Sequence, residues 1–103
     1  MRLMLIDVLY RRNSLNKGKS KPDEKYKGLR GCLFDFDENL MYFNDTSFRN
    51  LGGLDIKLYL IKPDGSAQFI MPLFTSPLTR IYVDDRYIML ETEKSVYKTQ
   101  RVG

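Results

Sequence analysis

The chain contains no histidine, no tryptophan and only one cysteine, Cys32. Without histidine it lacks the usual general base near neutral pH and the commonest protein ligand of transition metals. A lone cysteine forms no disulfide within the chain and builds no cysteine-based zinc site. We therefore expect a protein that holds no metal or other cofactor and that works in a reducing compartment, the cytoplasm.

Sequence patterns of the common enzyme classes are missing as well. No glycine pattern of a phosphate loop or dinucleotide site occurs, and no serine lies in the pattern of a nucleophile elbow. No apolar run approaches the roughly 20 residues that span a bilayer. The apolar segment 1–12 is interrupted by Asp7 and lacks a small-residue cleavage site, so we expect a strand there rather than a signal peptide. The sequence thus favours a binding protein over an enzyme, with no membrane partner.

Residues 54–102 show the clearest secondary structure, a series of short strands separated by turns. Apolar residues at positions 54, 56, 58 and 60 alternate with Asp55, Lys57 and Tyr59. This period of two is typical of a strand with one buried face. A Pro-Asp-Gly turn at 63–65 follows, so residues 54–74 are predicted to form a hairpin.

Further strands are predicted on both sides of this hairpin. Ser76 and Pro77 are expected to end its second arm, and Pro72, which lacks an N–H, is expected at a sheet edge or a bulge. The last strand is the most polar and is predicted to be an edge. Segment 44–53 is either one helical turn or a plain loop. The other predicted strands are 3–10, 31–36, 40–43, 79–83, 86–92 and 96–102.

Together these features predict an all-β fold in a single domain covering 1–103. Short antiparallel strands in a meander suit a small barrel, SH3-like or OB-like, or a strongly bent sheet. At most one short helical turn is expected.

The basic segment 11–30 departs from this pattern. Its eight lysines and arginines and two acids give it a formal charge of +6, whereas the rest of the chain, with nine basic and eleven acidic residues, carries −2. Its only large apolar residues are Leu15, Tyr26 and Leu29. Loops longer than about 12–15 residues are uncommon in small domains and are usually functional or disordered. We expect a long loop that is mobile in the free protein.

This basic segment is the strongest candidate for binding, because clustered lysines and arginines attract phosphate groups. Lysine predominates, and lysine acts as a point charge on a phosphate backbone more readily than it reads base edges. Tyr26 within the segment, and Tyr10 before it, can stack on an unpaired base. The competing interpretation is a solvated loop that maintains solubility. The predicted partner is a nucleic acid or an acidic protein surface, bound by Arg11, Arg12, Lys17, Lys19, Lys21, Lys25, Tyr26 and Lys27.

A second set of candidates lies on predicted strand faces. Tyr82 shares a face with Arg80, and Tyr97 shares one with Thr99 and Arg101. Such faces bind single-stranded nucleic acid by stacking and charge, or form protein–protein interfaces anchored by tyrosine and arginine. Tyrosine is also an ordinary strand residue. The candidate sheet-face contacts are Tyr59, Arg80, Tyr82, Tyr97 and Arg101.

Acidic and thiol groups are interpreted structurally. Asp35 and Asp37 point to one face of a strand, which is compatible with a hard cation, but they run into a turn, where aspartate is common for local reasons. Cys32 alternates with Phe34 and Phe36 and is predicted to be a small core residue. We therefore predict no metal site and no catalytic residue.

The alternative function is that of a protein-interaction, inhibitor or assembly protein, such as phages and mobile elements encode. Exposed strand edges fit this alternative. Strand 96–102 is predicted to pair with a second copy of the chain or with a partner strand.

Overall fold

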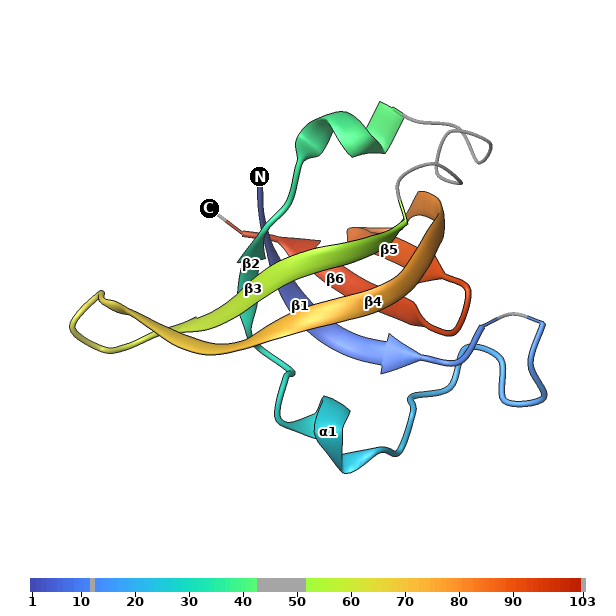
Figure 1. Cartoon of the computed structure of the whole chain (residues 1–103), viewed down its shortest axis with the longest axis horizontal. Coiled ribbons are helices and arrows are strands. Elements are labelled where there is room, and N and C mark those ends of the chain that lie inside the picture. Colours follow the sequence, from blue (N-terminus) through green and yellow to red (C-terminus); the bar gives the residue numbers. More distant parts are fainter. Residues whose placement is uncertain (12, 43–51, 103) are drawn as a thin grey trace.

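The computed structural model describes residues 1–11, 13–42 and 52–102, and of Tyr42 only the backbone. Within these residues, antiparallel strands follow one another around a closed barrel, and the last strand pairs with the first (Figure 1). The predicted all-β, barrel-like meander is confirmed. Its elements are β1 (Arg2–Leu9), α1 (Glu24–Lys27), β2 (Leu33–Asp35), the 3-10 helix η1 (Glu38–Tyr42), β3 (Gly53–Ile61), β4 (Ala67–Asp84), β5 (Tyr87–Thr92) and β6 (Val96–Arg101).

Alternate residues of neighbouring strands fill the barrel interior. Leu90 of β5 lies opposite Tyr97 of β6, which in turn lies opposite Val8 of β1, and all three side chains are buried. Cys32 is fully buried among them, as predicted for a small core residue, and burial raises the pKa of its thiol. Thr99 is buried as well, and its hydroxyl donates a hydrogen bond to the carbonyl oxygen of Ile88 at 2.7 Å. Its burial therefore leaves no unmet donor.

β4 is a single long strand that changes neighbours along its length. Its first part, up to Pro77, pairs with β3, and its second part, from Leu78, pairs with β5. The predicted break at Ser76 and Pro77 is therefore wrong. At this corner the Thr75 hydroxyl accepts the Leu54 N–H at 2.8 Å, and the carbonyl oxygen of Pro77 accepts the Glu93 N–H at 3.0 Å. These bonds let the strand continue through a proline instead of ending there.

Gly53 lies on β3 against the same corner. A Cβ atom at this position would come within 2.0 Å of the carbonyl oxygen of Thr75. The two backbones approach so closely that only glycine fits.

The hairpin of β3 and β4 projects beyond the barrel (Figure 1). The predicted turn at its tip is confirmed: Gly65 has a φ of +87°, and its N–H donates to the carbonyl oxygen of Lys62 at 2.9 Å. Because the tip has no core to cover, Leu60, Ile61 and Phe69 are exposed. The expectation that Leu60 shares the buried face of Ile56 and Leu58 is wrong for this reason.

The predicted edge at strand 96–102 is also wrong. β6 pairs with β1 on one side and β5 on the other. Within the described residues, the stretch 67–76 of β4 has a strand partner only on the β3 side. Pro72 lies in that stretch, close to a register shift opposite Leu58 and Tyr59, so its predicted place at an edge or bulge is confirmed.

Residues 40–42 belong to η1, so the predicted return strand at 40–43 is wrong where the structure describes it. The Asp37 side chain accepts the Asn39 N–H at 3.0 Å, and the Leu40 N–H donates to the Asp37 carbonyl oxygen at 3.1 Å. The turn that begins at Asp37 continues as a 3-10 helix instead of leading into a return strand. Most of the segment 44–53, with its predicted helical turn, lies outside the described residues. No helix in the described part of the chain is long and apolar enough to cross a membrane.

Candidate functional site

The basic segment 11–30 is hydrogen-bonded to the barrel at several points. The Tyr10 N–H donates to the carbonyl oxygen of Lys19 at 2.9 Å, which closes the turn between them. The Lys21 N–H then donates to the carbonyl oxygen of Val8 at 2.8 Å, so the returning chain runs along β1. After α1, Leu29 is buried in the core. The segment thus carries its charges on a backbone that β1 holds in place.

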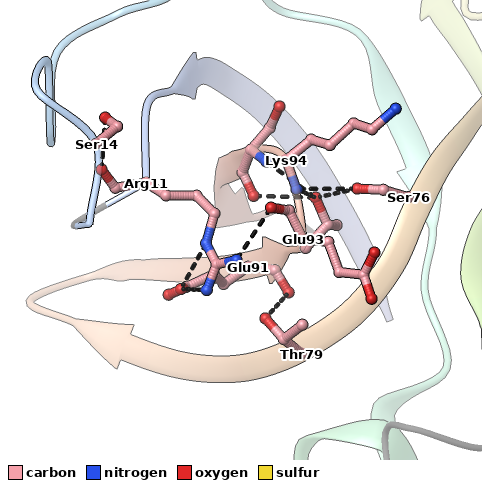
Figure 2. Close-up of polar contacts among 9 residues, drawn as sticks. Arg11, Ser14, Ser76, Thr79, Glu91, Glu93 and Lys94 are labelled. Carbon is pink, nitrogen blue, oxygen red and sulfur yellow. Dashed lines mark hydrogen bonds and ion pairs between the residues drawn. The ribbon is translucent and has the colours of Figure 1, made fainter.

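Arg11 binds the start of this segment to β5 and to the turn that follows it (Figure 2). Its Nη2 and Nε donate to Oε1 of Glu91 at 3.0 and 3.3 Å, and its Nη1 donates to the carbonyl oxygen of Glu93 at 3.0 Å. Glu91 is only 7% exposed, and its Oε2 has no hydrogen-bond partner among the described residues. The guanidinium is therefore engaged in compensating a buried carboxylate.

Two more basic side chains of the segment are paired with acids. At the end of the segment, Nη2 of Arg30 lies 2.9 Å from Oδ1 of Asp7, whose Oδ2 accepts the hydroxyl of Ser20. On α1, Lys27 pairs with Glu24 at 2.9 Å. Together with Arg11, these pairs neutralise three of the positive charges that the sequence concentrates here. Lys17 and Lys19 are exposed on the turn, and Arg12 lies outside the described residues.

Lys21 and Lys25 are held beside aromatic rings. Nζ of Lys21 donates to Oγ of Ser95 at 2.7 Å and lies 5.5 Å from the ring centre of Tyr10 and 6.0 Å from that of Tyr26. Nζ of Lys25 lies 4.9 Å from the ring centre of Tyr26. No carboxylate of the described residues lies within ion-pair distance of either lysine. The two charges are positioned but not neutralised.

A groove of about 290 Å³, lined in part by Lys25, lies between α1 and the first part of β4, which pairs with β3. Three of its residues, Leu29, Leu73 and Tyr97, are buried, whereas Phe74 is 68% exposed. None of the lining residues is acidic. The complete lining is Lys25, Tyr26, Leu29, Met71, Pro72, Leu73, Phe74 and Tyr97. The site therefore combines an aromatic groove with unneutralised positive charge at its rim.

The sequence candidates supply only part of this groove. Lys25 and Tyr26 come from the basic segment, but Met71, Pro72 and Phe74 were not among the predicted contacts. The signal available for them is that strand 67–74 becomes apolar on both faces towards its end. In a strand with a neighbour on each side and one solvated face, apolar and polar residues alternate instead.

Tyr97 is buried, at 6% exposure, so its prediction as an outer sheet-face contact is wrong. It does share a face with Thr99, but that face is the barrel interior. Burial, followed by the influence of Tyr26, raises the pKa of the Tyr97 phenol to about 12, while a hydrogen bond with Ser95 opposes the rise.

Because the pKa of Tyr97 is raised, folding stability changes with pH in the alkaline range. An unfolded tyrosine ionises near pH 10, so the stabilising contribution of the neutral Tyr97 phenol is fully present below about pH 10. It is lost as the pH rises through about 12. Between these values wild type is expected to lose stability relative to Tyr97→Phe, which keeps the ring and cannot ionise. Urea midpoints of both proteins across this range measure the difference. Parallel curves would show that the phenol titrates as in the unfolded chain.

The other sheet-face candidates occupy two places. The Arg80 guanidinium lies 4.5 Å from the ring centre of Tyr82 on the outer side of β4, as their shared face predicted. Tyr59 lies on β3, and the guanidinium of Arg2 lies 5.5 Å from its ring centre. Arg101 and Arg2 line one shallow hollow. These residues do not adjoin the groove, since none of them lines it.

Carboxylates and the thiol form no cluster of metal-ligand type within the described residues. Comparison of the chain with protein-family models, curated proteins and solved structures finds no match.

Proposed function

We propose that this protein is a non-enzymatic binding module that engages an anionic polymer. The binding face is formed by residues 19–26, which include most of α1, and by the adjoining groove. The observation that carries the proposal is the pair Lys21 and Lys25, held over Tyr10 and Tyr26 without a neutralising acid among the described residues. Partners of this chemistry are a nucleic acid or an acidic protein surface.

Only part of the segment's formal charge of +6 is available to a partner. Arg11, Lys27 and Arg30 are paired with acids and contribute little net field outside the protein. Lys21 and Lys25 are free to exchange counterions for a partner's anionic groups, and release of those counterions favours binding. Their ammonium groups suit phosphates or carboxylates in many orientations, because lysine imposes no planar, bidentate geometry.

A charge-reversal experiment tests this function. Lys19→Glu combined with Lys25→Glu reverses two exposed positive charges of the basic segment, of which Lys25 lines the groove, and leaves the hydrogen bonds of Lys21 to Lys94 and Ser95 in place. With fluorescein-labelled heparin as a base-free polyanion, wild type is expected to bind at low salt and to weaken steeply between about 50 and 200 mM salt. The double variant is expected to bind at least about tenfold more weakly, with a shallower salt dependence, as measured by fluorescence anisotropy.

The matched control reverses two exposed basic residues that do not line the groove, Lys62→Glu at the hairpin tip with Arg86→Glu in the turn between β4 and β5. Each reversal subtracts two charges, so both double variants lower the formal net charge from +4 to zero. The control is expected to keep most of the wild-type affinity. Equal losses in the two variants would reduce the effect to net charge alone, and absence of any heparin binding at low salt would refute the function.

Protein–protein interaction through the hairpin is the second candidate function. One observation favours it: Leu60, Ile61 and Phe69 are exposed together near the hairpin tip. The same two variants separate the candidates when a protein partner is assayed, because binding through the tip would be sensitive to the Lys62 reversal of the control and not to the reversals in the basic segment.

A further inference from the structure

We infer that the groove between α1 and β4 accepts an unstacked base of a single-stranded nucleic acid, whose phosphates lie against Lys21 and Lys25. This inference rests on the proposed function and names the class of anionic polymer. Single-strand binding sites combine positive charge along the backbone with aromatic side chains on which bases stack. The groove has both components in one place.

The walls of the groove are suited to a flat, apolar-faced group. Phe74 on β4 is mostly exposed, and Tyr26 on α1 faces the same hollow from the other side. Buried Leu29, Leu73 and Tyr97 close the floor. At about 290 Å³, the space lies at the small end of ligand pockets, which span roughly 300–1,000 Å³. It therefore fits one base or a comparable ring, not a bulky folded element.

The positive charges lie where a nucleotide would place its phosphate. Nζ of Lys25 lies 4.9 Å from the ring centre of Tyr26, and Nζ of Lys21 lies 6.0 Å from it. The hydrogen bond to Ser95 holds Nζ of Lys21 in this position. We expect a base that enters the groove beside Tyr26 to bring its phosphate towards these two ammonium groups. No acidic residue lines the groove to repel this phosphate.

An extended acidic peptide fits the same surface less well. Such peptides commonly add to a free strand edge through main-chain hydrogen bonds, and among the described residues β4 has no strand neighbour on this side. However, Pro72 lines the groove and has no N–H to donate, so the edge is interrupted where the peptide would pair. A nucleic acid needs no such main-chain donors.

The test compares three labelled probes: a short oligothymidylate, the abasic oligonucleotide of the same length, and polyglutamate. Wild type is expected to bind oligothymidylate at least about tenfold more tightly than the abasic strand, because one stacked base adds roughly that factor. Phe74→Ala is expected to remove most of this preference. Phe69→Ala, which truncates another exposed phenylalanine away from the groove, is the matched control and is expected to retain it.

The outcomes separate this inference from the proposed function. Equal affinity for the intact and abasic strands would overturn base binding, while the salt-dependent binding of heparin would still support the function. Tighter binding of polyglutamate than of oligothymidylate would assign the groove to an acidic protein instead. A second variant, Tyr26→Leu, preserves apolar packing on α1 and must also reduce the preference for intact strands; if neither groove variant does, the base does not occupy the groove.

Discussion

Replacing Phe34 by alanine is expected to lower the free energy of unfolding by about 3–5 kcal/mol. Phe34 of β2 is 1% exposed and lies opposite Leu3 of β1 inside the barrel. Truncation removes a large apolar side chain and leaves a cavity that the surrounding strands fill only in part. Urea-induced unfolding, followed by far-ultraviolet circular dichroism, measures the change.

Phe69→Ala provides the control for this prediction, because it makes the same chemical change at a side chain that is 59% exposed on the hairpin. Its effect is expected to stay within about 0.5 kcal/mol. If the two variants lost similar stability, the barrel interior would not be the main source of stabilisation. A loss below about 1 kcal/mol for Phe34→Ala would contradict its place in the core.

Replacing Arg11 by alanine is the second large expected effect, a loss of about 3 kcal/mol. The variant leaves Glu91 buried with neither oxygen compensated by a described group, because Oε2 already has no partner and Oε1 depends on Arg11. An unpaired buried carboxylate costs more than the pair itself contributes. Chemical unfolding near neutral pH, where the carboxylate of an unfolded glutamate is ionised, measures this loss.

A double variant separates the two sources of this loss. Arg11→Met with Glu91→Leu removes both charges and replaces them by apolar groups of similar length, and it is expected to recover most of the stability. The control Lys27→Ala breaks the exposed pair with Glu24 and is expected to cost less than about 0.5 kcal/mol. A double variant as unstable as Arg11→Ala would show that the unpaired charge of Glu91 is not the main cost, and would assign the loss to the hydrogen bond from Nη1 of Arg11 to the carbonyl oxygen of Glu93.

The contacts of Arg11 also affect the proposed binding site. Arg11 and the pair of Arg30 with Asp7 hold the two ends of the basic segment on the barrel. Lys21 and Tyr26 lie between them, so their position beside the groove depends on these ends. Arg11 was predicted from the sequence as a contact for the partner; in the folded protein its three hydrogen bonds give it a structural role, and the variant tests that role independently of any partner.

Much of the fold could be predicted because its signals are local. A period of two marks a strand wherever it occurs, and the Pro-Asp-Gly turn at 63–65 joins β3 to β4 as expected. The turns at Asp85 and at 93–94 likewise separate the last strands. Such features depend on residues a few positions apart, so the sequence contains all the information that they need.

The predictions from sequence were wrong where contacts with a distant segment determine the structure. The period of two grouped Tyr97 with Thr99 correctly, but only closure of the barrel showed that their face is the interior. Closure also paired β6 on both sides and so removed the predicted edge. Ser76 and Pro77 look like a strand end, yet the contacts from Leu54 and Glu93 carry β4 around a corner.

The candidate site divides in the same way. The sequence by itself determined that one segment holds the excess positive charge, because charge is a property of composition. Only the tertiary structure decided which of those charges stay free, since Arg11 finds its acid 80 positions away and Arg30 finds its own in β1. It also brought Phe74 beside Tyr26 to form the groove. Pairings between segments this far apart are set by how the barrel closes, and no local pattern records them.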